Sequence, residues 1–326
     1  MCTDHGERAC PEEMARLLGR RGFLRATAAG AAVTGAVGTG AALAAPASAA
    51  TAALAHGGGH RRVPLDQISI QLYTVRDILT ADPAGTLATL RRIGYRKVEA
   101  AGTAGLTAAQ FRALLDRNGI RATSAHMGIP QPWDADAWRA SLAEAKVLGA
   151  STVIHAFFGV NENGPIRDAA IWRNFALDLN KAGALARQAG LEFGYHNHHY
   201  EFNRVTDGSN RRAWDILTRT ADPRLVKLEM DIYWAWRGTA DPVDLLQQQG
   251  RRVKKFHVKD MDLESSFADP GTGLIDFPRV FAANARYGGV TEFIVERDDA
   301  GTGDRVPADA LDTARVGFEF LRNVRF

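Results

Sequence analysis

From residue 65 onward, short apolar or β-branched runs alternate with longer stretches that have helical periodicity. The sequence predicts a strand at each of eight such runs: 68–73, 97–100, 122–127, 152–157, 192–196, 226–231, 253–258 and 292–296. Strand and helix repeated eight times is the pattern of a closed parallel barrel with its helices outside. We therefore expect an α/β fold, a (β/α)8 TIM barrel that forms a single domain over residues 65–326.

Local signals support several of the helices. Thr107-Ala-Ala-Gln110 is a capping-box pattern, and Gly119 is expected to end the helix that follows it. Asp241-Pro242 places proline at a first helical position. Further helices are predicted at 134–148, 167–188, 211–220, 277–287 and 308–324. An open doubly wound sheet is the alternative, but residues 71–74 are Gln-Leu-Tyr-Thr and not a glycine-rich phosphate turn.

The N-terminal segment has the parts of an export signal. Arg20-Arg21 is followed by Phe-Leu, by an apolar stretch rich in Ala and Gly, and by Ala-Ser-Ala at 47–49. The arginine pair resembles a twin-arginine signal. We expect a cleaved signal peptide at 1–49, a flexible leader at 50–64, and a periplasmic or extracellular protein. A membrane anchor is the alternative, which the high Ala and Gly content disfavours.

Cysteine content and charge exclude several classes of site. Cys2 and Cys10 both lie in the predicted signal, so the mature chain would have neither disulfides nor thiolate ligands. Without the five basic and four acidic side chains of residues 1–49, the net charge of +3 becomes +2. This balance lacks the basic excess typical of nucleic-acid binding. We expect no nucleic-acid partner and no stable membrane insertion after signal removal, and the sequence leaves a homo-oligomer open.

Polar residues gather at the ends of the predicted strands. Six of the eight histidines after residue 49 lie there: His126, His155, His196, His198, His199 and His257. Glu99, Asp231 and Glu296 end three other runs. Because the carboxyl ends of barrel strands form one face, these side chains should lie together. Carboxylates and imidazoles without thiolates suit a divalent metal ion.

Five segments give a more specific indication: 70–76, 194–202, 230–231, 256–260 and 295–296. They read Ile-Gln-Leu-Tyr-Thr-Val-Arg, Gly-Tyr-His-Asn-His-His-Tyr-Glu-Phe, Met-Asp, Phe-His-Val-Lys-Asp and Val-Glu. In this order, from residue 65 to the end, the chain resembles the xylose-isomerase-like barrel superfamily, in particular its sugar phosphate isomerase/epimerase branch. The resemblance implies a catalytic metal and a sugar-type substrate.

The resemblance also implies a ligand set of Glu, Asp, His and Glu on strands five to eight. Asp231, His257 and Glu296 match the last three, whereas strand five ends in His196-Asn197-His198. We expect His196 as the fourth ligand. His198, Glu201 or a site with three protein ligands are the alternatives. The expected cofactor is one divalent ion, Mn²⁺ first, with Mg²⁺, Co²⁺ and Zn²⁺ as alternatives.

Other strand-end residues are candidates for chemistry and substrate binding. We expect Glu296, His155, His198 and Lys259 to be catalytic. Lys259 would hold a substrate oxygen or stabilise an enolate, and an exposed loop lysine is the alternative. The residues expected to bind substrate are Gln71, Glu99, His126 and Trp234, and the Trp234 ring suits the apolar face of a sugar.

The predicted function is a metal-dependent sugar isomerase or epimerase that removes a proton next to a carbonyl. Its substrate would be a free sugar, a keto-sugar or a glycoside, since sugar phosphates are rare outside the cytoplasm. The missing carboxylate on strand five makes a keto-glycoside or keto-polyol lyase or dehydratase the first alternative. A non-catalytic sugar-binding barrel and a metal-dependent hydrolase of the apurinic endonuclease type are the alternatives from other classes.

Overall fold

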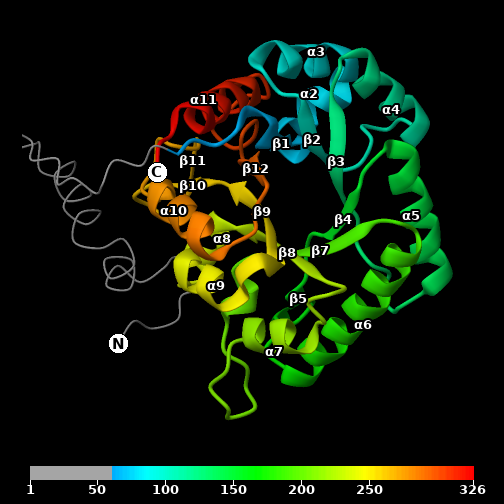
Figure 1. Ribbon diagram of the computed structural model, residues 1–326, viewed down its shortest axis with the longest axis vertical. Coiled ribbons are helices and arrows are strands. Elements are labelled where there is room, and N and C mark those ends of the chain that lie inside the picture. The colour runs from blue at the N-terminus through cyan, green and yellow to red at the C-terminus, as the bar shows by residue number, and fades with distance from the viewer. Residues whose placement is uncertain (1–60) are drawn as a thin grey trace, which may run out of the picture.

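The computed structural model describes residues 61–326. The predicted signal peptide, most of the predicted leader and both cysteines lie outside these residues. Eight parallel strands close into a barrel in the order β1-β12-β9-β8-β7-β4-β3-β2 (Figure 1), which confirms the predicted TIM barrel. Their bounds are β1 Ile68–Gln71, β2 Lys97–Ala100, β3 Arg121–His126, β4 Thr152–His155, β7 Glu192–His196, β8 Lys227–Asp231, β9 Val253–Val258 and β12 Glu292–Val295.

Helices surround the barrel (Figure 1). They are α2 Arg76–Ala81, α3 Pro83–Ile93, α4 Ala108–Arg117, α5 Ala135–Leu148, α6 Ala169–Gln188, α7 Ala213–Thr220, α8 Ile232–Arg237, α9 Pro242–Gln249, α10 Phe277–Tyr287 and α11 Asp309–Asn323. The capping box at Thr107 is present. Asp241 caps α9, with Pro242 at its first position. Gly119, at a φ of +61°, follows the end of α4.

Two short hairpins in the loops beyond strand ends were not predicted. Val160–Asn161 (β5) pairs with Gly164–Pro165 (β6) after β4. Asp260–Met261 (β10) pairs with Phe267–Ala268 (β11) after β9. Both lie beyond the carboxyl ends of barrel strands, where loops carry function in this fold.

Strand periodicity divides the side chains of each strand between two environments. In β8, Leu228 and Met230 join the apolar layer between the barrel and its helices. Glu229 and Asp231 alternate with them and point into the barrel, where they meet residues from other strands. The interior at the carboxyl end of the barrel is therefore polar, whereas the layer outside it is apolar.

The folded body begins before residue 65, earlier than expected. Val63 is buried in the core. The backbone of Arg61 exchanges two hydrogen bonds with Phe326, at N–O distances of 3.3 and 3.2 Å. Residues 61–64, which the sequence assigned to the flexible leader, therefore pack against the barrel because an apolar side chain and a backbone pair fix them there.

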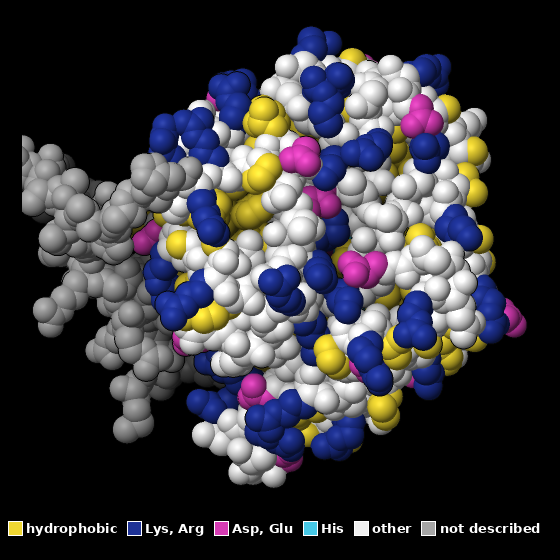
Figure 2. All heavy atoms as spheres, in the orientation of Figure 1, with side chains coloured by type: hydrophobic (Ala, Val, Ile, Leu, Met, Phe, Trp, Pro, Cys, Tyr) yellow, Lys and Arg dark blue, Asp and Glu magenta, His cyan; other side chains and the backbone are white. Residues whose placement is uncertain are grey.

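The outer surface of the described residues is mixed in character. Lys and Arg side chains are spread over the face drawn in Figure 2, with Asp, Glu and apolar side chains between them. Between residues 61 and 326, no helix combines the length and apolar character needed to cross a membrane.

Candidate active site

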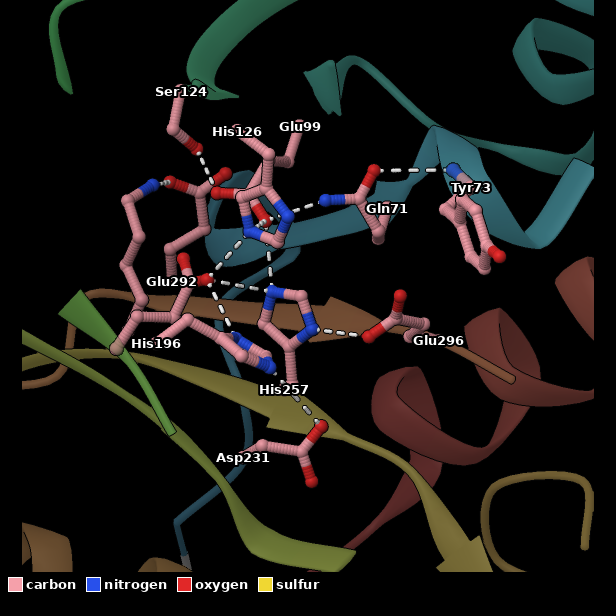
Figure 3. Close-up of polar contacts among 12 residues, drawn as sticks. Gln71, Tyr73, Glu99, Ser124, His126, His196, Asp231, His257, Glu292 and Glu296 are labelled. Carbon is pink, nitrogen blue, oxygen red and sulfur yellow. Dashed lines mark hydrogen bonds and ion pairs between the residues drawn. The ribbon is translucent and has the colours of Figure 1, made fainter. Parts of the chain in front are cut away.

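Five residues, each from a different strand, meet inside the barrel, and we call them the inner cluster: Glu99 of β2, His126 of β3, His196 of β7, Glu229 of β8 and His257 of β9. Glu229 Oε1 lies 2.9 Å from His126 Nε2, 3.0 Å from His196 Nδ1 and 3.0 Å from His257 Nε2. Glu99 Oε1 lies 2.9 Å from His126 Nε2 and 2.8 Å from His257 Nε2. Figure 3 shows the three imidazoles converging from different strands.

A second group lies next to it and is called the outer cluster: Asp231, His257, Lys259, Glu296 and Asp298. Lys259 Nζ is 3.0 Å from Asp231 Oδ2, 3.0 Å from Glu296 Oε2 and 2.7 Å from Asp298 Oδ1. His257 Nδ1 is 2.5 Å from Glu296 Oε2. Because Nε2 of the same ring faces Glu99 and Glu229, His257 belongs to both clusters.

Neighbouring side chains fix the orientation of the carboxylates. Gln71 Nε2 and Ser124 Oγ donate to the two oxygens of Glu99, at 2.9 and 2.6 Å. Asp231 Oδ1 accepts from Trp234 N at 2.8 Å and so caps α8. Asn197 bonds both the N–H and the C=O of Asp231. These contacts leave Asp231 Oδ2 free to face the outer cluster.

Opposite charges hold the buried groups in their ionised forms. Burial acts to raise the pKa of Glu229, but the charge of His257 and hydrogen bonds from three imidazoles hold it well below the usual value. Burial lowers the pKa of His126, yet Glu99 and Glu229 raise it to about 10. For Lys259, burial is outweighed by three carboxylates, so its pKa lies well above the usual value.

A cavity of about 300 Å³ opens above both clusters. It is lined by Tyr73, Ala101, His126, Ala156, Phe157, His196, His198, Lys259, Glu296 and Asp298. Tyr73 and Phe157 are 44% and 48% exposed, so two aromatic rings stand at its mouth. Another cavity of similar volume lies between α7 and α9 and contains none of these residues.

The structure brings most of the predicted site residues together. His196, Asp231, His257 and Glu296, the predicted metal ligands, lie side by side, with His196 Nε2 3.7 Å from Asp231 Oδ2. Lys259 is 1% exposed, so the alternative of an exposed loop lysine is wrong. His198 lines the cavity, and its Nδ1 has no hydrogen-bond partner among the described residues.

The position of His155 corrects the prediction of a catalytic role. Its ring points outward and packs against Phe175 and Tyr195. Nδ1 accepts from Ile129 N, and Nε2 contacts the carbonyl of Phe157, both at 2.9 Å. Burial lowers the pKa of His155 to about 4, so the ring is a neutral part of the layer between barrel and helices.

Other predicted positions differ in smaller ways. Gln71 and Glu99, predicted to bind substrate, are fully buried and are not among the residues that line the cavity, and their contacts orient the inner cluster. Trp234 lies beside the cavity, with its ring 5.5 Å from Lys259 Nζ. Glu201, an alternative fourth ligand, turns away from both clusters, because it accepts from Tyr195 Oη at 2.5 Å and His198 N at 3.0 Å.

Two residues of the site were missed from the sequence. Glu229 lies two residues before Asp231, and Asp298 two residues after Glu296. Side chains two apart on a strand point the same way. Counting two residues back along the strand from the predicted ligand Asp231 would have identified Glu229. Asp298 lies beyond the end of β12, where the period is a weaker guide.

The donor groups fit a metal ion. Two carboxylate oxygens, Glu229 Oε2 and Asp231 Oδ2, are buried with no hydrogen-bond partner among the described residues, although Asp231 Oδ2 has ion-pair contacts with Lys259 and His196. Two sets of side chains place their donor atoms within 4.8 Å of one another: His126, His196, Glu229 and His257, and Asp231, His257 and Glu296. Carboxylates with imidazoles are the usual protein ligands of divalent transition metals.

Comparison with known proteins gives a consistent result. A family described as xylose isomerase-like TIM barrel matches residues 87–324. An inosose dehydratase from Bacillus thuringiensis (strain Al Hakam) is 28% identical over 203 residues, 55% of this chain. That match spans 64% of the dehydratase, less than two thirds of its length.

Two solved structures share the fold. A sugar phosphate isomerase/epimerase from Parabacteroides distasonis ATCC 8503 has a TM-score of 0.67 at 22% identity, over 85% of this chain and 98% of that chain. The IOLI protein with a bound zinc atom has a TM-score of 0.60 at 14% identity, over 80% and 99%. At these identities the likeness shows the fold alone.

Proposed function

The chain belongs to the xylose isomerase-like TIM barrel family, and from this premise we propose that it is a metal-dependent sugar isomerase or epimerase. The reaction would begin with removal of a proton next to a carbonyl of a free sugar, keto-sugar or glycoside. The observation that carries this proposal is the outer cluster, where carboxylates, an imidazole and an ammonium meet at the floor of a cavity of about 300 Å³.

The proposed metal residues are Asp231, His257 and Glu296, with His196 as the fourth. The outer cluster is favoured because Glu296 and His196 also line the cavity, where a substrate oxygen could reach an open position. A divalent ion bound there would polarise a carbonyl oxygen and stabilise an enediolate. Mn²⁺ is proposed because two of the four ligands are carboxylates.

The side chains around the cavity can move protons. Glu296 is ionised, because the charges of Lys259 and His257 outweigh its burial and hold its pKa well below the usual value. His198 is neutral, because burial and the charge of His196 lower its pKa. Glu296, directly after β12, and His198, after β7, are therefore two candidate bases that line the same cavity, and inversion at a carbon requires two. Lys259 is placed to stabilise negative charge on a substrate oxygen.

Charge pairing argues for a substrate without phosphate. Among the described residues that line the cavity, the cationic side chains are Lys259 and His126, and both contact carboxylates. A phosphate would need a cation that is not already paired. The cavity volume also lies at the low end of small-molecule sites, which suits a single sugar ring.

A lyase or dehydratase is the second candidate. The inosose dehydratase relative supports it, as does His196, which stands on strand five where the resemblance led us to expect glutamate. An elimination starts with the same proton loss but needs one base and an acid for the leaving group. Asp298 could be that acid, because burial raises its pKa to about 6.

Metal content and proton exchange test the proposal together. We would measure bound metals by plasma mass spectrometry and follow keto-sugars and glycosides in deuterated water by NMR. The wild type should exchange the proton next to the carbonyl, and Asp231→Asn should lose both the outer ion and the exchange while keeping the cap of α8. Glu292→Gln, which changes a buried glutamate paired with Lys255 and Thr123, is the matched control.

The products separate the two candidate reactions. An epimerase returns deuterated substrate and its epimer, whereas a lyase releases water or an aglycone. A wild type that takes up no Mn²⁺, Co²⁺ or Zn²⁺ would contradict the enzyme proposal and favour a sugar-binding barrel.

A further inference from the structure

Four donor atoms of the inner cluster form a closed ring. His126 Nε2 is 2.9 Å from Glu99 Oε1 and 2.9 Å from Glu229 Oε1. His257 Nε2 is 2.8 Å from Glu99 Oε1 and 3.0 Å from Glu229 Oε1. Each nitrogen therefore faces two carboxylate oxygens, although an imidazole nitrogen carries at most one hydrogen. Hydrogen bonding alone cannot satisfy all four contacts fully.

The four atoms lie close enough together to share one metal ion. Their separations of 2.8–3.0 Å are shorter than the roughly 3.4 Å between ligands that lie about 2.1 Å from a tetrahedral zinc ion, so binding would open the ring by about 0.5 Å on each side. His196 Nδ1, 3.0 Å from Glu229 Oε1, adjoins the ring. We propose that the inner cluster holds a zinc ion of its own, with ligands from Glu99, His126, Glu229 and Nε2 of His257, while His196 remains a ligand of the outer ion through its Nε2, which faces Asp231.

The surroundings indicate a closed site of structural type. Glu99, Glu229 and His257 are at most 1% exposed, and only His126 and His196 reach the cavity. The protein supplies four donors, two of them imidazoles, a set that favours Zn²⁺ or Co²⁺ over Mg²⁺ or Ca²⁺. Gln71 and Ser124 hold Glu99 in place, as outer hydrogen bonds commonly do around metal ligands.

The shared histidine joins this site to the proposed catalytic one. With zinc on its Nε2, His257 keeps a hydrogen on Nδ1 and donates it to Glu296 of the outer cluster, 2.5 Å away, so the outer ion would then be held by His196, Asp231 and Glu296. The inner ion would then fix the plane of a ring that the outer cluster also uses. This inference goes beyond the proposed function, which requires only the outer ion.

Counting metal ions tests the inference without any substrate. The purified full chain would be stripped with a chelator, loaded with excess Zn²⁺, desalted and measured by plasma mass spectrometry. We expect two ions per chain in the wild type. Glu229→Gln should lose the inner ion and Asp231→Asn the outer ion, leaving one in each. Glu292→Gln, a buried glutamate outside both clusters, should keep two.

The possible counts separate this inference from the proposed function. A single wild-type ion that Glu229→Gln keeps and Asp231→Asn loses would overturn the inner site and leave the proposed function intact. A single wild-type ion that Asp231→Asn keeps and Glu229→Gln loses would support the inner site and contradict the outer one. No ion in the wild type would overturn both. If Glu229→Gln does not fold, as judged by circular dichroism, His126→Gln at the cavity edge replaces it, with the same expected loss.

Discussion

Lys259 is the single ammonium among three carboxylates, of which Asp231 and Glu296 are buried, and its removal should leave the repulsion between them uncompensated. Removing one partner of a buried ion pair typically costs about 3–5 kcal/mol, so we expect Lys259→Met to lower the free energy of unfolding by about that amount. Added Mn²⁺ should restore part of the loss, because an ion at Asp231 and Glu296 would replace the missing charge.

Denaturant unfolding with Mn²⁺ and with chelator measures both effects. Lys146→Met, on the exposed side of α5, is the matched control and should change stability by less than about 0.5 kcal/mol. A Lys259→Met protein that is as stable as the wild type, or that is insensitive to Mn²⁺, would contradict the assigned role of the ammonium.

Glu201 should make stability depend on pH. Burial is the main cause that raises its pKa from 4.5 to about 7. The folded state therefore binds the proton more tightly, and this contribution is present below pH 4.5 and is lost as the pH rises through about 7. Glu201→Gln stays neutral, so its stability relative to the wild type should rise across this window, by an amount on the order of 3 kcal/mol, and then level off.

Unfolding curves between pH 4.5 and 8 check this expectation. Glu144→Gln, on the exposed surface of α5, controls for the substitution itself. A difference between Glu201→Gln and the wild type that stays constant over the window would show that Glu201 is ionised throughout.

The alternation of side chains between the two faces of a strand explains which site residues could be predicted from the sequence. Asp231 and His257 were found because the apolar runs end at them and the resemblance assigns them a role. His155 was misassigned because a strand end does not reveal which face a side chain takes, and Val153 and His155 both face the helices. The contact between His257 and Glu99 joins residues 158 positions apart, so only closure of the barrel creates it.

At the scale of elements, all eight strands were predicted, with ends that differ by no more than two residues. The largest differences occur where local contacts stop a strand. β1 ends at Gln71 because its side chain accepts from Tyr73 N and starts the short helix Leu72–Val75. The hairpins β5–β6 and β10–β11 have strands of two residues, too short to show any periodicity.

Helix α6 packs closely on the loop before β8 through Gly183. A Cβ at this position would lie 2.5 Å from the carbonyl oxygen of Leu225, which belongs to the backbone and cannot move aside. Gly183→Ala should therefore destabilise the protein by about 1–3 kcal/mol, although alanine in a helix is favoured by about 1 kcal/mol. Gly128→Ala, with open space at the Cβ position, should be close to neutral.

Denaturant unfolding of the two alanine variants compares the positions directly. Equal stability of the Gly183→Ala protein and the wild type would mean that α6 can shift away from the Leu225 loop.

At the scale of the whole molecule, we propose that the chain is exported by the twin-arginine route and cleaved near residue 49. Expressed in a bacterium with that pathway, the wild type should appear outside the cytoplasm with a new N-terminus near residue 50. Replacing both arginines, Arg20→Lys with Arg21→Lys, should retain it inside. N-terminal sequencing and cell fractionation provide the measurement, and unchanged export of the double variant would contradict the assigned route.

The backbone pair between Arg61 and Phe326 places the first and last described residues next to each other. A short peptide could therefore join them without crossing the barrel, and the chain could instead be opened at the exposed turn around Gly208. Such a circular permutant would keep every strand neighbour while changing the order in which the strands are synthesised. The closed barrel therefore does not require the chain to begin before β1, and a chain that begins in another loop should reach the same fold.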